Sequence, residues 1–251
     1  MTTPPLSGKT ALVTGGGRRI GRAIALALAN AGADVAITFF RTSREESSQT
    51  LSEIAALGCR AVALECDVRS EESARKAVAE AAAILGRLDL LVNNAAVFSS
   101  SPLESLSLEE WDTVFDTNTR GPFLMAREAL PHLRETEGRI INIGSLGGLK
   151  AWATHGHYSS SKAALHTLTQ AMAKAFAPQV TVNCVAPGWI DLDEKNKTEE
   201  NESAARHFAQ RTPMQRNGTA DDIAQAVLFF ATGPRFVTGQ ILAVDGGLGL
   251  V

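Results

Sequence analysis

Short apolar runs alternate with amphipathic segments along most of this chain, and this alternation limits the possible folds more than any other feature. We interpret the apolar runs as buried strands over residues 9–14, 34–39, 60–66, 88–93, 138–144, 180–185 and 241–244. Apolar residues recur at helical spacing between them, over residues 20–31, 43–57, 71–86, 111–134, 157–176 and 221–231. This order predicts an α/β fold with a doubly wound parallel sheet of about seven strands and helices on both faces. In such a sheet, ligands bind beyond the carboxyl ends of the strands.

The composition fits one globular domain spanning residues 1–251, since 45% of the residues are hydrophobic and 20% are charged. The net charge is −3 and the basic residues are scattered, which argues against a nucleic-acid partner. The N-terminus lacks a signal pattern and no apolar run approaches the ~20 residues that cross a bilayer, so we expect a cytoplasmic protein without membrane contact. Cys59, Cys66 and Cys184 lack metal-ligand spacing, so we expect no metal site and a reducing compartment.

One polar segment, residues 188–218, interrupts the alternation. It is rich in Glu, Asn and Lys, and the only helix expected in it is a short one near residues 204–210. A segment of this length between packed elements is either disordered or a functional lid. We favour a substrate-binding lid, because exposed connections of this kind often carry function.

A glycine-rich turn lies between the first expected strand and the first expected helix. It consists of Gly15, Gly16, Gly17, Arg18, Arg19, Ile20 and Gly21. Glycine permits positive φ angles and close backbone approach, and the following helix start offers free N–H groups to a phosphate. A glycine cluster also suits a plain strand-to-helix turn. Its position after a strand and before a periodic helix favours the binding of a pyrophosphate.

The end of the second expected strand indicates which dinucleotide binds. An NAD site usually offers the ribose a carboxylate about 20 residues after the glycine loop. Here that place holds Arg41, Thr42 and Ser43, and the first carboxylate comes only at Glu45. A guanidinium suits a 2′-phosphate, so the sequence predicts NADP(H), although Arg41 could instead only solvate a helix start. Asp67 is a candidate partner for the adenine amino group or the cap of a turn.

Tyr158 is followed four residues later by Lys162. If the segment is helical, both side chains lie on one face, and a nearby ammonium lowers the pKa of a phenol towards the range of a proton-transfer catalyst. This spacing is also common on protein surfaces. A catalytic role for the pair is therefore indicated only if other motifs of the chain support it.

Several separate motifs together resemble the short-chain dehydrogenase/reductase family, over nearly the whole chain. In the family's order they are the glycine loop at residues 14–21, Asp67-Val68, Asn93-Asn94-Ala95-Ala96, Asn118, Ser145, Tyr158 with Lys162, Pro187-Gly188, and the ending from Thr238-Gly239 to Gly246-Gly247. The resemblance implies a Rossmann-like, NADP(H)-dependent oxidoreductase that transfers a hydride between nicotinamide and a carbonyl or alcohol.

The resemblance also implies roles for individual residues. Ser145 would hydrogen-bond the substrate carbonyl, Tyr158 would transfer the proton, Lys162 would bind the nicotinamide ribose, and Asn118 would hold a water. Taken singly, Ser145 could simply end a strand and Asn118 could be a hydrogen bonder inside a helix. The glycine loop, the end of the second expected strand and the family motifs together give the expected cofactor-binding residues. They are Gly15, Gly17, Arg18, Arg19, Ile20, Gly21, Arg41, Thr42, Ser43, Asp67, Val68, Asn94, Ala95, Ala96, Tyr158, Lys162, Pro187, Gly188 and Ile190.

The chain also departs from the family pattern. The family loop commonly has a glycine where this chain has Arg19, and the Arg-Ile-Gly form resembles pteridine reductases. Those enzymes typically have an aspartate where this chain has Ser145, which argues against a full match, so pteridine reduction is only the alternative function. The threonine that often follows the Pro187-Gly188 turn is not evident at residues 191–193. A non-catalytic dinucleotide sensor is a third reading, which the presence of both Tyr158 and Lys162 disfavours.

The substrate is less defined than the reaction. We expect a ketone or 3-oxoacyl thioester reductase, with a pocket rimmed by Leu146, Trp152, His155, His157 and Trp189. His157 fits a wall residue better than a catalytic partner. The resemblance also suggests a homotetramer, or a homodimer, in which the helix near residues 223–230 and the apolar tail 248–251 could be buried; both could instead belong to the core.

Overall fold

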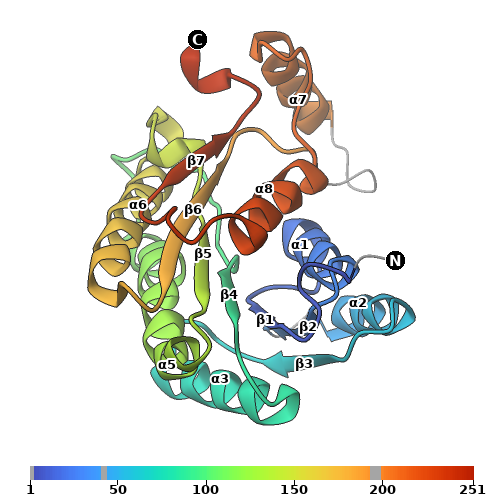
Figure 1. Ribbon diagram of the computed structural model, residues 1–251. Coiled ribbons are helices and arrows are strands. Elements are labelled where there is room, and N and C mark those ends of the chain that lie inside the picture. Colours follow the sequence, from blue (N-terminus) through green and yellow to red (C-terminus); the bar gives the residue numbers. More distant parts are fainter. Residues whose placement is uncertain (1–2, 41–43, 193–198) are drawn as a thin grey trace.

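The computed structural model describes residues 3–40, 44–192 and 199–251, with side chains in the last range from Glu202 onward. Within these residues, seven strands form one parallel sheet in the order β3-β2-β1-β4-β5-β6-β7 (Figure 1). The strands are β1 Thr10–Val13, β2 Asp34–Phe39, β3 Ala61–Glu65, β4 Leu90–Asn93, β5 Arg139–Ile143, β6 Thr181–Pro187 and β7 Ile241–Val244. The predicted doubly wound sheet is confirmed. Its strand order reverses between β1 and β4, where such sheets bind ligands at their carboxyl ends.

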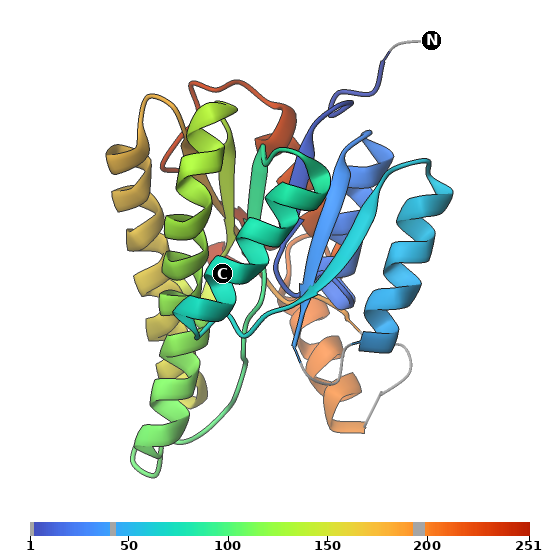
Figure 2. The same ribbon diagram turned by 90° about the horizontal axis from the view of Figure 1, so that it is seen from below.

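Two layers of helices cover the sheet. The helices are α1 Arg19–Asn30, α2 Arg44–Ala56, α3 Glu71–Leu85, α4 Leu108–Phe115, α5 Gly121–Glu135, α6 Gly156–Phe176, α7 Glu199–Arg211 and α8 Ala220–Thr232. Buried side chains of α3, α5 and α6 form one apolar cluster with the sheet, and those of α1, α2 and α8 form the other. Figures 1 and 2 show these two groups of helices on opposite faces. Most strand residues are apolar because both faces of the sheet are covered.

Helix ends follow local sequence signals. Helix α3 begins after Ser70, whose side chain accepts a hydrogen bond from the Ser73 N–H, and it ends at Gly86 with φ of 85°. A capping serine and a left-handed glycine are the usual start and stop of a helix. These signals explain why the expected span of residues 71–86 is nearly the observed one.

One predicted helix is interrupted by a wider turn. The segment expected as a single helix over residues 111–134 consists of α4, a π-helical turn over Asp116–Arg120 and α5. A π turn keeps side chains near helical spacing, so the apolar periodicity does not reveal it. The turn contains Asn118, one of the expected site residues.

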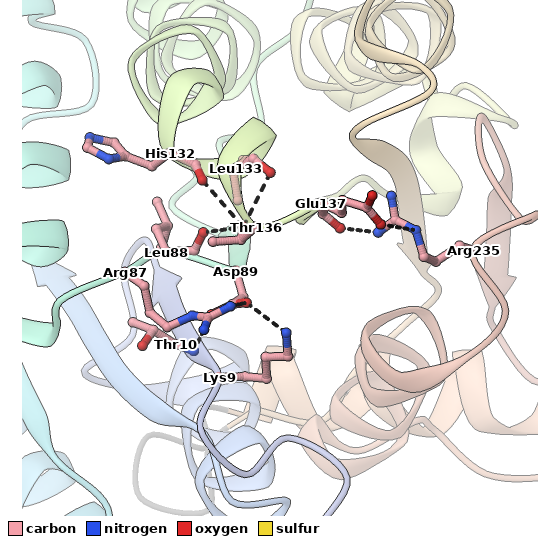
Figure 3. Close-up of polar contacts among 10 residues, drawn as sticks. All are labelled: Lys9, Thr10, Arg87, Leu88, Asp89, His132, Leu133, Thr136, Glu137 and Arg235. Carbon is pink, nitrogen blue, oxygen red and sulfur yellow. Dashed lines mark hydrogen bonds and ion pairs between the residues drawn. The ribbon is translucent and has the colours of Figure 1, made fainter.

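At the amino ends of the strands, a polar cluster ties neighbouring segments together (Figure 3). Asp89 accepts hydrogen bonds from the Lys9 Nζ and the Thr10 N–H, both at 3.0 Å, and from Arg87 at 2.6 and 2.7 Å. Thr136 Oγ1 donates to the carbonyl of Leu88 at 2.8 Å. Lys9, Thr10, Asp89 and Thr136 border a cavity of about 270 Å³. Because its polar groups are already satisfied by one another, this edge serves to join β1, β4 and β5.

No helix in the described part of the chain is long and apolar enough to span a membrane.

Candidate active site at the carboxyl ends of the strands

The glycine loop forms a tight turn between β1 and α1. Gly15 has φ of +63°, and its N–H donates to Thr38 Oγ1 at 3.2 Å. A Cβ added at Gly21 would lie 2.1 Å from the Gly15 carbonyl oxygen, and one added at Gly17 would lie 2.4 Å from Ser47 Oγ. Arg18 caps α1 without a side-chain hydrogen bond. The helix start therefore keeps backbone N–H groups available for an anion, as a pyrophosphate site requires.

Asn94 braces this loop from the end of β4. Its Nδ2 donates to the carbonyls of Thr14 at 2.9 Å and Gly15 at 3.2 Å. The backbone N–H groups of Asn94 and Ala95 both donate to Thr14 Oγ1, at 2.9 and 3.0 Å. The side chain predicted to line the cofactor thus also holds the glycine turn in position.

Arginines gather at the carboxyl ends of β2 and β3. The Arg44 guanidinium lies 5.6 Å from the Phe39 ring centroid, and that of Arg69 lies 5.7 Å from the Phe40 ring centroid. Arg18 lies 3.8 Å from a Glu46 carboxylate oxygen. Arg41, Thr42 and Ser43, the predicted partners of the 2′-phosphate, lie outside the described residues.

Asp67 takes the turn-capping role that the sequence left open. Its carboxylate accepts the Arg69 backbone N–H at 3.0 Å and also binds the Arg69 guanidinium, with the shortest contact at 2.7 Å. Val68 is buried against Gly121, where an added Cβ would lie 2.9 Å from Val68 Cγ2. Contact of Asp67 with an adenine remains a prediction.

Tyr158 and Lys162 lie on the same side of α6. The Lys162 Nζ is 5.8 Å from the Tyr158 ring centroid and donates to the Ile143 carbonyl at 2.8 Å. Lys162 is 3% exposed, and this burial lowers its pKa to about 8. A buried ammonium loses solvation, which explains the direction of that shift.

The predicted lowering of the Tyr158 pKa is wrong for this structure. Burial raises the pKa of the Tyr158 phenol, and a side-chain hydrogen bond with Ser145 only partly opposes that rise. The physical reason is that removal of the phenolate from water dominates, while the Lys162 Nζ is engaged by the Ile143 carbonyl. Sequence spacing predicts which face two residues share, but it does not report their burial.

Ser145 meets Tyr158 from the end of β5. Its side chain accepts a hydrogen bond from the Gly147 N–H at 3.0 Å, which caps a short 3₁₀ turn over Leu146–Gly148. A Cβ added at Gly147 would lie 3.3 Å from Ser145 Oγ and 3.6 Å from Tyr158 Cε1. The hydroxyl groups of Ser145 and Tyr158 therefore belong to one hydrogen-bonded pair at the sheet edge.

Asn118 is fully buried, and its amide joins two segments of the site. Its Oδ1 accepts the Val97 N–H at 2.8 Å, and its Nδ2 donates to the Val97 carbonyl at 2.9 Å and to Ser161 Oγ at 3.1 Å. This is the helix-interior hydrogen bonding that the sequence left open. A role in holding water remains a prediction.

The Pro187–Ile190 turn continues directly from β6. The Gly188 N–H donates to the Val244 carbonyl at 3.0 Å, and a Cβ added at Gly188 would lie 2.7 Å from Asp245 Cα. Ile190 pairs with Gly218 in an isolated parallel bridge. The expected lid, residues 188–218, is thus joined at its two ends, while residues 193–198 lie outside the described part.

A row of aromatic rings extends from Tyr158 to α7. Phe98 meets Tyr158 edge-on at 4.9 Å and stacks on His155 at 4.8 Å, measured between ring centroids. Trp152 meets His155 at 6.0 Å and stacks on Phe208 at 5.4 Å, and Trp189 stacks on Phe208 at 4.3 Å. We call Phe98, His155, Trp152, Phe208 and Trp189 the aromatic row.

The sequence predicts three members of this row, Trp152, His155 and Trp189, at the pocket rim. It does not predict Phe98 or Phe208. The available signal for Phe208 was an aromatic residue inside an otherwise polar helix, since the described α7 side chains include no other phenylalanine or tryptophan. Leu146, also expected at the rim, is buried, and a Cβ added at Gly249 would lie 3.0 Å from its Cδ1.

His157 does not lie exposed at the pocket rim, where the sequence predicts it. It is fully buried, its Nε2 shares a 2.7 Å hydrogen bond with Ser99 Oγ, and it lies 3.6 Å from Glu110. Within residues 3–40, 44–192 and 199–251, no group of three His, Cys, Asp or Glu side chains is placed to hold a metal ion.

Comparisons with known proteins agree on one family. A family model described as enoyl-(acyl carrier protein) reductase matches residues 16–249. The crystal structure of a short-chain dehydrogenase from Burkholderia cenocepacia J2315 in complex with NADP has a TM-score of 0.88 and 40% identity, and the match covers 97% of this chain and 99% of that one. This chain belongs to the short-chain dehydrogenase/reductase family. The family resemblance predicted from the motifs is confirmed, and the protein is an oxidoreductase of this family.

Two similar short-chain dehydrogenase/reductase relatives are fungal. Versicolorin reductase 1 of Aspergillus parasiticus is 38% identical over 254 residues, which cover 96% of this chain and 97% of that protein. A protein of Zymoseptoria tritici named a probable tetrahydroxynaphthalene reductase is 38% identical over 260 residues, which cover 97% of this chain and 96% of that protein. This short-chain dehydrogenase/reductase therefore matches reductases of its own length.

Proposed function

We propose that this protein is an NADPH-dependent ketone reductase with Tyr158 as its proton donor. The main support is the hydrogen-bonded pair of Ser145 and Tyr158 at the carboxyl edge of the sheet, with Lys162 on the same side of α6. Reduction of a carbonyl develops negative charge on oxygen, which requires a positioned donor and a source of a proton. Ser145 and Tyr158 are suited to supply both.

The loop and its neighbours fit a dinucleotide. The tight turn at Gly15, Gly17 and Gly21 leads into uncapped N–H groups of α1, which suit a pyrophosphate. The arginines near β1 and β2, together with Arg41 in the sequence, suit the 2′-phosphate of NADP(H). The NADP complex of the Burkholderia relative supports the same cofactor. Asn94 and the Pro187–Ile190 turn would border the nicotinamide end.

When bound, the coenzyme supplies the hydride that reaches the carbonyl carbon. Ser145 then orients the substrate by a hydrogen bond to the carbonyl oxygen, and Tyr158 donates its proton to that oxygen. The overall reaction is ketone plus NADPH plus H⁺ to alcohol plus NADP⁺. Lys162 would hold the coenzyme ribose and stabilise the phenolate that proton donation leaves, and Asn118 would help return a proton from solvent.

The sequence favours ketones or 3-oxoacyl thioesters as substrates. The names of the two fungal relatives favour cyclic ketones as the first compounds to test. Residues 188–218 would cover the bound substrate as a lid, since this segment begins and ends beside the Ile190–Gly218 bridge.

Substitution of Tyr158 by Phe tests this proposal. Loss of the general acid should lower kcat for NADPH-dependent ketone reduction by roughly 10²- to 10⁴-fold. The dissociation constant for NADPH, measured by coenzyme fluorescence, should stay nearly unchanged because the substitution removes only the hydroxyl. A Tyr158→Phe enzyme with near wild-type kcat would contradict the proposal.

A further inference from the structure

The aromatic row connects the reacting end of the site to the helix that covers it. Its first ring, Phe98, contacts Tyr158, and its last two rings, Phe208 and Trp189, stack at 4.3 Å with planes 16° apart. The Trp152 plane is 21° from that of Phe208. Two indole planes are therefore nearly parallel to one phenyl ring. Phe208 stacks on the ring faces of Trp152 and Trp189 in this structure. We call these two ring faces the aromatic slot.

The slot is assembled from segments far apart in the chain. Trp152 lies between β5 and α6, Trp189 follows β6, and Phe208 belongs to α7. All three side chains are only half-buried, so the stack is not part of either apolar cluster of the core. Aromatic side chains commonly line pockets for small molecules, and their flat faces suit flat ligands.

Helix α7 is only lightly attached to the rest of the molecule. None of its side chains from Glu202 to Arg211 is buried, and the helix lies apart from both helix layers (Figure 1). Asn217 Nδ2 donates to the Ala205 carbonyl at 3.0 Å, which holds the helix from its own following turn. Phe208 is the residue through which α7 stacks on Trp152 and Trp189. Movement of α7 would therefore carry Phe208 away from the slot.

We propose that the aromatic slot binds a planar aromatic ring of the substrate and that Phe208 occupies it in the substrate's place. The inference rests on the proposed ketone reduction and specifies its substrate class: ketones attached to, or fused with, an aromatic ring. With the carbonyl oxygen at Ser145 and Tyr158, such a ring system would lie along Phe98 and His155 towards Trp152. Stacking favours flat π systems over saturated rings of equal size.

A matched pair of ketones tests the substrate class. 1-Tetralone and 1-decalone share one carbon skeleton and carbonyl position, but only the first has a flat aromatic ring. We expect wild-type kcat/KM to favour 1-tetralone by roughly tenfold, the range expected of aromatic stacking. Trp189→Leu should raise the KM for 1-tetralone by about three- to tenfold and leave that for 1-decalone nearly unchanged. Trp152→Leu should act in the same direction.

Phe208→Ala tests the occupancy of the slot. Because the substitution removes the ring that competes with substrate, it should lower the KM for 1-tetralone and change that for 1-decalone little. Trp111→Leu is the matched control, since Trp111 stacks on Phe115 at 4.8 Å, outside the aromatic row. A higher KM for 1-tetralone in Phe208→Ala would overturn the competing role of Phe208.

Calorimetric titration of 1-naphthol and 1-decalol separates this inference from the proposed reaction, because it measures binding without turnover. Tighter binding of 1-naphthol than of 1-decalol, together with weaker 1-naphthol binding in Trp189→Leu, supports the slot. If neither ketone is reduced in that case, only the proposed reaction fails. If both ketones are reduced equally well and 1-naphthol shows no preference, the reaction stands and the slot is wrong. Equal losses on both ketones in Trp189→Leu would likewise overturn the slot, because they would show a purely structural role.

Discussion

Replacement of Lys162 by Met should change how the stability of the protein depends on pH. The side chain is 3% exposed, and burial lowers its pKa from the ordinary value of 10.5 to about 8. Such a shift corresponds to roughly 3 kcal/mol of preference for the neutral amine in the folded state. The unfolded chain binds more protons than the folded one between these two pKa values, so stability should rise with pH across that window.

The magnitude follows from linkage. Below the folded-state pKa of about 8, the ammonium is charged in both states and the folded protein bears the full penalty of burying it. From about pH 7 to about pH 10 the wild-type free energy of unfolding should therefore rise by roughly 2 kcal/mol relative to Lys162→Met. The variant also loses the hydrogen bond to the Ile143 carbonyl. That loss is nearly independent of pH. It shifts the free energy of unfolding of the variant by a constant amount and does not change how the difference from wild type varies with pH.

Urea unfolding followed by tryptophan fluorescence, without added coenzyme, measures this difference at several pH values. Lys76→Met is the matched control, because the Lys76 side chain is 72% exposed on α3. Its difference from wild type should stay within about 0.5 kcal/mol at every pH. A pH-independent difference between wild type and Lys162→Met would refute the reasoning, since it would mean that the ammonium is not penalised by burial.

Two further predictions concern the loop and the phenol. Arg19 has φ of +50°, a left-handed conformation that suits glycine, so Arg19→Gly should leave the free energy of unfolding unchanged or raise it by up to ~1 kcal/mol. Arg18 has φ of −153°, so Arg18→Gly should instead lower the free energy of unfolding by ~0.5–1 kcal/mol. Equal destabilisation in urea unfolding would contradict the role of the left-handed backbone. Tyr158 is the only tyrosine, so ultraviolet absorbance should report its ionisation alone, with a midpoint above the ordinary 10.0 that rises further in Ser145→Ala. A midpoint below 10.0 would show that burial does not dominate.

Much of the fold could be predicted because its signals are local. Strands buried on both faces are mostly apolar, and β1 and β4 show this pattern, each with a single polar residue, Thr10 and Asn93. Ser70 and Gly86 mark the ends of α3 by hydrogen bonding and φ angle, which are properties of single residues. The glycine loop could likewise be located from its place between a strand and a helix.

The rest could not be predicted because it depends on contacts between distant segments. The burial that raises the pKa of Tyr158 arises from the folded surroundings of α6, and the sequence contains only the spacing to Lys162. The stack of Phe208 on Trp152 and Trp189 joins three segments whose meeting no local pattern indicates. The side-chain amide of Asn118 is bound by Val97 and Ser161, which lie 21 and 43 residues away.

The raised pKa of Tyr158 suits the role of a proton donor in the proposed carbonyl reduction. A reductase needs a phenol that still holds its proton at neutral pH, and burial keeps Tyr158 in that form by raising its pKa. Lys162, with a pKa of about 8, is still charged near neutrality. A phenol with a strongly lowered pKa would instead favour removal of a proton from an alcohol. Burial of Tyr158 therefore keeps the phenol in the protonated form, which is the form that can donate a proton to a carbonyl oxygen.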